Sequence, residues 1–162
     1  MSGLRMTMWS KLLISAVVMP AIILAGCATT PSYQAKATNR SDGAIVRGWQ
    51  SGTFMYLTFT HTEIEKVDGL RLSVWSQTGG GWLVDPGLRV LSVAGTYAGG
   101  FGGVERYAGR VELDATLIAG HSYRIKAERS GGIMTFWVED EEMHAAASEK
   151  RTTNTTHWIN WL

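Results

Sequence analysis

The sequence predicts an all-β domain, an antiparallel β-sandwich of about seven to eight short strands. Three observations favour this fold. Short runs rich in β-branched and aromatic residues recur at a spacing of roughly 8–12 residues. Glycine is abundant, at 19 of 162 residues, and clusters between these runs, as expected of turns. Beyond residue 44, no segment of ten or more residues has the period of a core helix.

The first half of the domain contains the first predicted hairpin. Ile45–Trp49 is a candidate strand, and Phe54–His61 has the aromatic and β-branched content of a half-buried sheet. Asp68-Gly69 lies between apolar runs and predicts a tight hairpin turn. Leu70–Trp75 alternates between apolar and polar residues, and the apolar positions are predicted to face inward: Leu70, Leu72 and Val74.

The middle of the chain combines a turn signal with a glycine-rich stretch. Trp82–Val84 leads into Asp85-Pro86-Gly87, whose Pro-Gly pair fits the centre of a type II turn. Leu88–Val93 is the next predicted strand. Gly95–Gly109 is rich in glycine and aromatic residues, and we expect it to be a long connection rather than a strand.

Three strands and a polar extension complete the domain. Arg110–Ile118 alternates over nine residues, and turns at 119–121 and 130–132 lead to strands from Tyr123 and from Ile133. These three strands are predicted to form a meander. A short surface helix is expected in 139–151, and polar coil in 152–156. The apolar tip 157–162 is open to three interpretations: an added strand, a contact with a membrane interface, or a contact with a partner.

The N-terminus has the organisation of a secretory signal. Arg5 and Lys11 precede an apolar run, Leu12–Leu24, and small residues follow it. The run of about 13 residues is short of the roughly 20 that a spanning helix needs, which disfavours a permanent transmembrane segment. The initiator could be Met1, Met6 or Met8, and the choice does not affect this interpretation.

The end of that run, Leu24-Ala25-Gly26-Cys27, resembles the lipobox of bacterial lipoproteins at every position. The resemblance implies that a signal peptidase recognises Leu24, Ala25 and Gly26 and cuts before Cys27. It also implies a diacylglycerol on the Cys27 sulfur, and often an acyl chain on the new amino group. Ala28, rather than Asp, follows the cysteine, which favours the outer over the inner membrane in enteric-type bacteria. The alternative is that Cys27 is an ordinary small residue ending a signal peptide.

This organisation divides the chain into four parts: a signal peptide (1–26), a lipidated flexible tether (27–43), a β-sandwich domain (44–142) and a polar extension with an apolar tip (143–162). Cleavage removes two positive charges and moves the formal charge from +1 to about −1, so no basic excess indicates a nucleic-acid partner. Cys27 is the sole cysteine, and once acylated it leaves the domain without a disulfide.

A second resemblance covers roughly Ile64 to Glu142. It is to small proteobacterial lipoproteins of unassigned function whose domain is similar to the PEGA and transthyretin-like sandwiches. It depends on short turn motifs in a fixed order: Val67-Asp68-Gly69, Asp85-Pro86-Gly87-Leu88-Arg89-Val90, Ala119-Gly120-His121-Ser122-Tyr123-Arg124-Ile125 and Trp137-Val138-Glu139-Asp140. The resemblance implies a sandwich fold and carries no catalytic residue. The glycine-rich connection and the tip depart from that class.

Two acidic stretches contain residues that can ligate metal ions. His61, Glu63 and Glu65 alternate along a predicted strand, with successive ligands about 6.6 Å apart on one face. Glu139–Glu142, with His144, is a second acidic cluster. The solvated outer face of an antiparallel strand has the first pattern, and we favour that interpretation for it. For the second cluster we favour a solvated run of charges. The sequence thus predicts no metal and no cofactor beyond the lipid.

No catalytic residue is predicted. His121 precedes a strand, but the sequence has no Gly-x-Ser-x-Gly elbow and no Ser-x-x-Lys, so a turn residue bonded to backbone is the favoured interpretation. Phe101 and Tyr107, in the expected loop, are weak candidates for stacking on a sugar.

The sequence as a whole predicts a non-enzymatic lipoprotein of the cell envelope that binds or supports another envelope component, such as a protein or peptidoglycan. The lipid would confine the domain to a surface and raise its effective concentration there. The alternative is a module that binds a glycan or small ligand on the cell surface. A hydrolase is the third hypothesis, and it would need Ser, His and Asp side chains that converge in a cleft.

Overall fold

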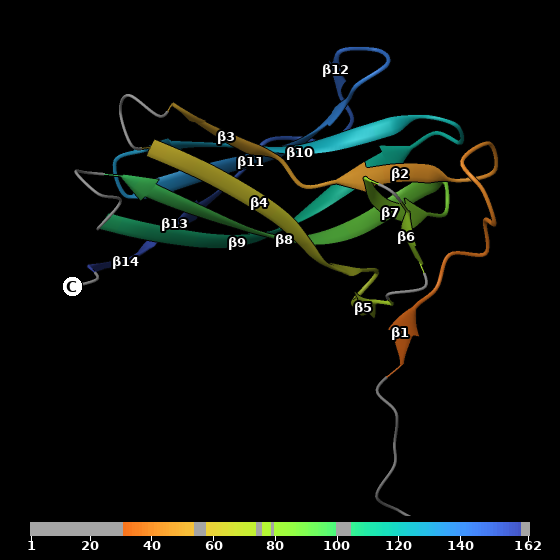
Figure 1. Cartoon of the computed structure of the whole chain (residues 1–162), viewed down its shortest axis with the longest axis horizontal. Helices are drawn as coiled ribbons and strands as arrows, with labels where there is room; N and C mark the ends of the chain where they lie inside the picture. The colour runs from red at the N-terminus through yellow and green to blue at the C-terminus, as the bar shows by residue number, and fades with distance from the viewer. Residues whose placement is uncertain (1–30, 54–57, 74–75, 79, 100–104, 160–162) are drawn as a thin grey trace, which may run out of the picture. The chain divides into compact units, whose positions relative to one another are not determined.

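The computed structural model describes residues 31–162, apart from 54–57, 74–75, 79, 100–104 and 160–162. These residues form strands and connections, with no α-helix among them. The strands belong to two sheets, which we call sheet A and sheet B (Figure 1). The predicted all-β class is confirmed. The described residues contain more strands than expected, and several are only two to four residues long.

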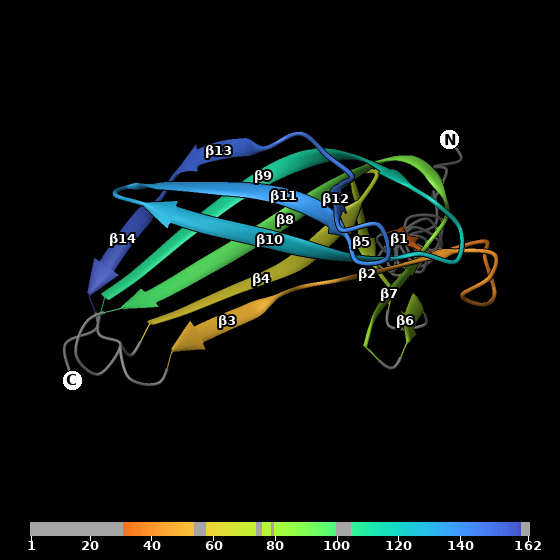
Figure 2. The same ribbon diagram turned by 90° about the horizontal axis from the view of Figure 1, so that it is seen from above.

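Sheet A has the order β1-β5-β4-β8-β9-β14, with β3 also paired to β4. Its strands are β1 (Ser32–Tyr33), β3 (Gln50–Thr53), β4 (Thr58–Val67), β5 (Leu70–Leu72), β8 (Gly87–Gly99), β9 (Glu105–Leu117) and β14 (Thr156–Ile159). The two longest strands, β8 and β9, pair in antiparallel register over 13 residues and run the length of the domain (Figure 2).

Sheet B has the order β12-β11-β10-β2-β7-β6, with β13 also paired to β11. Its strands are β2 (Ala44–Arg47), β6 (Gln77–Thr78), β7 (Gly81–Val84), β10 (Ser122–Ser130), β11 (Ile133–Asp140), β12 (Ala145–Ala146) and β13 (Arg151–Asn154). Both sheets are mixed, because β1 runs parallel to β5 and β2 runs parallel to β10. The expectation of a purely antiparallel sandwich is therefore wrong.

The inner faces of the two sheets share one hydrophobic core. In sheet A the core side chains alternate along β8 and β9, with Leu91, Leu113 and Leu117 almost fully buried. Ile125 and Phe136 are buried from sheet B. This alternation was predicted for 110–127 and is confirmed. The predicted meander is wrong, because β9 belongs to sheet A whereas β10 and β11 form a hairpin in sheet B.

The stretch Gly95–Gly109 is not a long connection. Its two ends continue β8 and β9, where Gly95 lies directly opposite Gly109. A Cβ atom on Gly95 would lie 2.5 Å from Phe136 Cε1, and one on Gly109 would lie 3.4 Å from Cε2 of the same ring. The two glycines therefore form a notch in sheet A that admits the Phe136 ring from sheet B.

The predicted tether is part of the domain from Ser32 onward. Tyr33 is buried in the core, at 6% exposure. The Asp85 carboxylate accepts hydrogen bonds from the Tyr33 hydroxyl at 3.1 Å and from the backbone N–H groups of Lys36 and Ala37 at 2.8 and 2.9 Å. The flexible tether predicted for residues 27–43 is therefore wrong for this segment. Residues 27–30 lie outside the described part of the chain.

The C-terminal segment is also more ordered than predicted. Residues 139–151 contain the end of β11, a turn and β12, so the expected helix is absent. The expected coil at 152–156 lies largely in β13 and β14. At Thr155 the chain crosses from sheet B to sheet A, and the Thr155 N–H donates to the Gly132 carbonyl oxygen at 2.8 Å. Because β14 pairs with β9, the added-strand interpretation of the tip is supported for Thr156–Ile159.

Two predicted turns are confirmed. Asp68 and Gly69 both have positive φ, at 51° and 78°, and join Val67 directly to its partner Leu70, as a two-residue hairpin turn requires. Gly87 has a φ of 101°, which fits the glycine position of the turn that leads from β7 into β8. Leu70 itself is exposed, at 36%, so the prediction that it faces inward is wrong, and Val74 lies outside the described residues.

Candidate functional site

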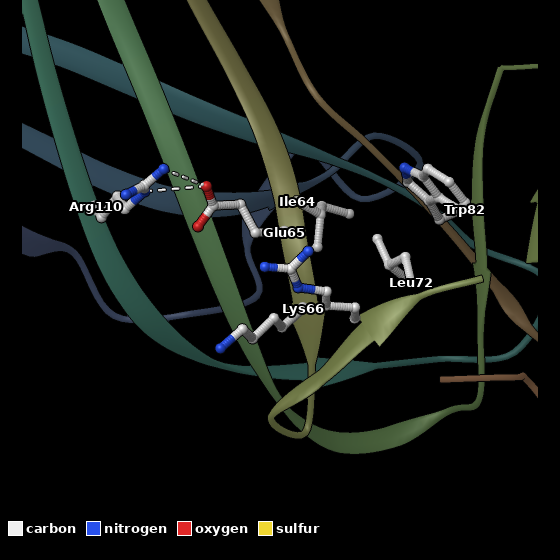
Figure 3. A pocket seen from close by; sticks show the side chains of 7 residues that line it. Ile64, Glu65, Lys66, Leu72, Trp82 and Arg110 are labelled. Carbon is white, nitrogen blue, oxygen red and sulfur yellow. Dashed lines mark hydrogen bonds and ion pairs between the residues drawn. The ribbon is translucent and has the colours of Figure 1, made fainter. Parts of the chain in front are cut away.

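A hollow lies where β4 and β5 separate, opposite β7. The β4–β5 hairpin makes only two residue pairs. Three apolar side chains form the floor: Ile64 from β4, Leu72 from β5 and Trp82 from β7. Figure 3 shows them gathered on one side of the hollow, which has a volume of about 500 Å³. Ile64 is buried, whereas Leu72 and Trp82 are half-buried.

The rim of this hollow is charged. It consists of Glu65, Lys66, Arg71 and Arg110, and together with the floor these residues define what we call the β4 groove. Glu65 is the extra residue of a β-bulge, because the register of β4 against β8 shifts between Ile64 and Lys66. The Arg110 guanidinium donates to Glu65 Oε1 from Nη2 at 2.8 Å and from Nε at 3.0 Å (Figure 3).

The other two rim cations have a different environment. Lys66 lies directly opposite Arg71 in the β4–β5 hairpin. Within the described residues, neither side chain forms an ion pair or hydrogen bond with a carboxylate. Like charges directly opposite on neighbouring strands repel each other and destabilise the pair. The rim therefore presents two adjacent, unneutralised positive charges beside an apolar floor.

A second hollow of about 340 Å³ extends the groove along β4. It shares Ile64 and Trp82 with the first and reaches Trp49, where the chain passes from sheet B to sheet A. The backbone N–H of Trp49 donates to Thr62 Oγ1, and the backbone N–H of Thr62 donates to the Trp49 carbonyl oxygen, both at 2.8 Å. These bonds hold the main chain of Trp49 beside β4, and Lys126 Nζ lies 4.9 Å from the centre of its indole ring. Trp49 lines the second hollow, and Trp82 lines both.

A second candidate site lies at the start of β10 and the end of β11. His121 Nδ1 lies 2.8 Å from Asp140 Oδ2, and Asp140 is only 3% exposed. Asp140 Oδ1 accepts the N–H groups of Glu142 and Met143, both at 3.0 Å, and Glu142 Oε2 accepts the Ser122 N–H at 2.7 Å. The carboxylates thus hold the turn after β11 against the start of β10.

The electrostatics of this corner favour ionised carboxylates. Burial raises the pKa of Asp140, but the hydrogen bonds from the Met143 N–H and from His121 outweigh it, and the net pKa lies below its usual value. The pKa of Glu142 is lowered in the same way, by the Ser122 N–H acting against burial. Neighbouring Tyr123 has a raised pKa, chiefly because it is buried.

These three side chains could hold a cation, because one ligand atom from each of His121, Asp140 and Glu142 lies within 4.8 Å of the others. However, both carboxylates already accept backbone N–H groups, which gives the cluster a structural role in the turn. Within the described residues, no hydroxyl or thiol is bonded to the imidazole, so a base with an orienting acid is present without a bonded nucleophile. The predicted bonding of His121 to backbone is confirmed for its main chain, because its N–H donates to the Ile118 carbonyl oxygen at 3.3 Å and its carbonyl oxygen accepts the Ile45 N–H at 3.0 Å. The partner of its side chain is Asp140.

The predicted glycan-stacking residues do not form a site. Phe101 lies outside the described residues. Tyr107 lies on β9 rather than in a loop, and its ring is already covered. Arg129 Cζ lies 3.5 Å from the ring centre, and the His157 ring stacks on it at 4.4 Å. A sugar could not reach the face of Tyr107 without displacing one of these groups.

The outcome differs among the remaining residues that were predicted from the sequence. Leu24, Ala25, Gly26 and Cys27 lie outside the described residues, so the lipidation site stays a prediction. His61 and Glu63 are exposed on β4, and Glu65 is engaged by Arg110, so these three do not converge on one point.

In the second acidic stretch, only Asp140 and Glu142 join the His121 cluster within the described residues. Glu139 pairs with Lys126, and Glu141 pairs with Arg47 and Arg124.

The β4 groove was not predicted from the sequence, although part of it could be inferred there. The turn at Asp68-Gly69 fixes Val67 opposite Leu70, and the next pair outward is then Lys66 with Arg71. The contribution of Trp82 depends on the packing of sheet B against sheet A, which no local pattern indicates. Comparisons of the chain with protein-family models, with curated protein sequences and with solved structures found no match.

Proposed function

We propose that this chain is a non-enzymatic, lipid-anchored lipoprotein of the bacterial cell envelope, more specifically of the outer membrane. The proposal depends on one observation: a short apolar run after a basic start ends in Leu24-Ala25-Gly26-Cys27. No helix among the described residues is long and apolar enough to cross a membrane. A lipid on Cys27 would supply the attachment, since two or more acyl chains on one residue hold a protein stably.

In this proposal the β domain binds another component of the envelope, and the β4 groove is the contact. The groove combines an apolar, tryptophan-bearing floor with a charged rim, which is the composition of a binding site rather than of a packed sheet face. The anchor would hold the groove near a surface and so raise its effective concentration toward ligands there. The alternative hypothesis is a module that binds glycans or small ligands. In that case the β4 groove, and not the predicted 95–109 loop, would be the binding site.

The experiment that tests this role is crosslinking in living cells, followed by mass spectrometry. A photoreactive amino acid is placed at Glu63, an exposed residue of the adjoining hollow, and a control one at Arg151 on β13. We expect adducts with an envelope protein or with peptidoglycan from position 63 only. Adducts from both positions alike, or with lipid alone, would contradict a binding role for the groove.

A further inference from the structure

The β4 groove has a chemical selectivity that follows from its rim and floor. We propose that it binds an acidic oligosaccharide, a glycan segment that bears carboxylate groups, with a carboxylate between Lys66 and Arg71 and a sugar ring against Trp82. This inference rests on the proposed function in that the ligand would be an envelope glycan, but binding itself does not require the lipid anchor.

The anionic part of the ligand follows from the pairing of Lys66 with Arg71. The hairpin turn forces these cations into direct opposition, and within the described residues no acid neutralises them. An anion between the two side chains would replace their repulsion with two charge-assisted hydrogen bonds, which are the stronger kind. The third cation, Arg110, is already paired with Glu65, so the rim has room for one carboxylate at this position.

The sugar part follows from the shape and polarity of the groove. A cavity for an acyl chain is enclosed and lined mostly by apolar side chains, whereas here four of the seven lining residues are charged. The hollow that Trp82 lines adjoins a second one, which shares Ile64 and Trp82 with it and is also lined by Trp49. Aromatic rings offer flat apolar surfaces, and bordering charges can bond hydroxyl and carboxylate groups. An extended chain of acidic sugars matches both features.

The test uses the full-length protein, purified in detergent, and isothermal titration calorimetry with three probes. These are tetragalacturonate, its fully methyl-esterified and therefore neutral form, and octanoate. We expect tetragalacturonate to bind with an affinity that falls as salt concentration rises, and the ester to bind at least tenfold more weakly. Equal binding of acid and ester would overturn the proposal. So would binding of octanoate in preference to the glycan, or no binding of tetragalacturonate at millimolar concentration.

Matched variants locate the site. Lys66→Gln and Arg71→Gln should each weaken tetragalacturonate binding about tenfold, while the melting temperature stays the same or rises because repulsion is relieved. The control pair is Arg106→Gln and Arg151→Gln, two exposed cations on β9 and β13 that lie outside the groove lining. Unchanged binding in the Lys66/Arg71 double variant, or equal losses in the control pair, would refute the assignment.

A second pair of variants tests the floor. Trp82→Leu should weaken binding more than Trp137→Leu, because Trp137 lies on β11 outside the groove, where it contacts Lys150. Trp82 also packs against the core, so each variant is first checked for a cooperative melting transition. If Trp82→Leu does not fold, the charge variants decide the question. If the protein is anchored normally in the membrane but does not bind tetragalacturonate, this inference fails and the proposed anchoring stands. If it binds tetragalacturonate but is not anchored, the proposed function fails and this inference stands.

Discussion

The notch formed by Gly95 and Gly109 allows a quantitative test of how the two sheets pack. In Gly95→Ala, the new methyl group would lie 2.5 Å from Phe136 Cε1, 2.8 Å from Cζ and 3.0 Å from Met134 Cε. Phe136 is fully buried, so its ring cannot swing into solvent. Overpacking of this kind costs about 1–3 kcal/mol. Replacing glycine lowers the entropy of the unfolded chain, which offsets about 0.4–1 kcal/mol of that cost.

We therefore expect Gly95→Ala to lower the free energy of unfolding by about 1–2 kcal/mol in urea denaturation. For a domain of this size the melting temperature should fall by roughly 3–10 °C. Gly132→Ala is the matched control, because a Cβ there meets no atom within 4 Å and should change stability by less than about 0.5 kcal/mol.

A double-mutant cycle with Phe136→Leu isolates the contact. The smaller side chain leaves space in front of Gly95, so Gly95→Ala should cost less than about 0.5 kcal/mol in that background. Two results would show that the Phe136 ring does not occupy the notch and that the described packing is wrong. One is that the losses of stability from Gly95→Ala and Phe136→Leu are additive, and the other is that Gly95→Ala has the melting temperature of the wild type.

Three further predictions concern the ends of the chain and the His121 corner. Asp85→Ala should lower the free energy of unfolding by about 2–3 kcal/mol, because it removes the acceptor for the Lys36 and Ala37 N–H groups; unchanged hydrogen exchange of those two amides would contradict it. The pKa of Asp140 is lower in the folded state, so its contribution is full above about pH 4 and is lost as pH falls further; Asp140→Asn should therefore flatten the acid limb of the stability curve measured from pH 7 to pH 2. Deletion of 156–162 removes β14 from the edge of β9 and should lower the melting temperature, whereas an unchanged value would assign the tip to contacts outside the domain.

Much of the fold could be predicted because its signals are local. The Asp68-Gly69 turn and the alternation in 110–127 depend only on neighbouring residues, and both are confirmed. The switch of the chain from sheet A to sheet B between β9 and β10 is not visible in such patterns, since alternation predicts a strand but not its sheet. For that reason three alternating segments predict one meander, although they belong to two sheets.

Other errors have a specific physical origin. Glycine signals turns when it supplies positive φ, but Gly95 and Gly109 are needed for a close approach by an aromatic ring, and the sequence does not distinguish these uses. The polar composition of 32–42 predicts a tether. This segment is nevertheless held by Asp85, which lies about 50 residues further along the chain. The His121–Asp140 contact likewise joins a turn to the end of a strand 19 residues later.

The central claim is that Cys27 carries the lipid that holds this domain on a membrane, and metabolic labelling tests it most directly. Cells that express the wild-type chain or Cys27→Ser are grown with an alkyne-tagged palmitate, and the protein is recovered and assayed for the tag. We predict a labelled, cleaved wild-type protein in the outer-membrane fraction and an unlabelled Cys27→Ser protein that remains an uncleaved precursor. Absence of label from the wild type, or normal cleavage and membrane retention of Cys27→Ser, would contradict the account.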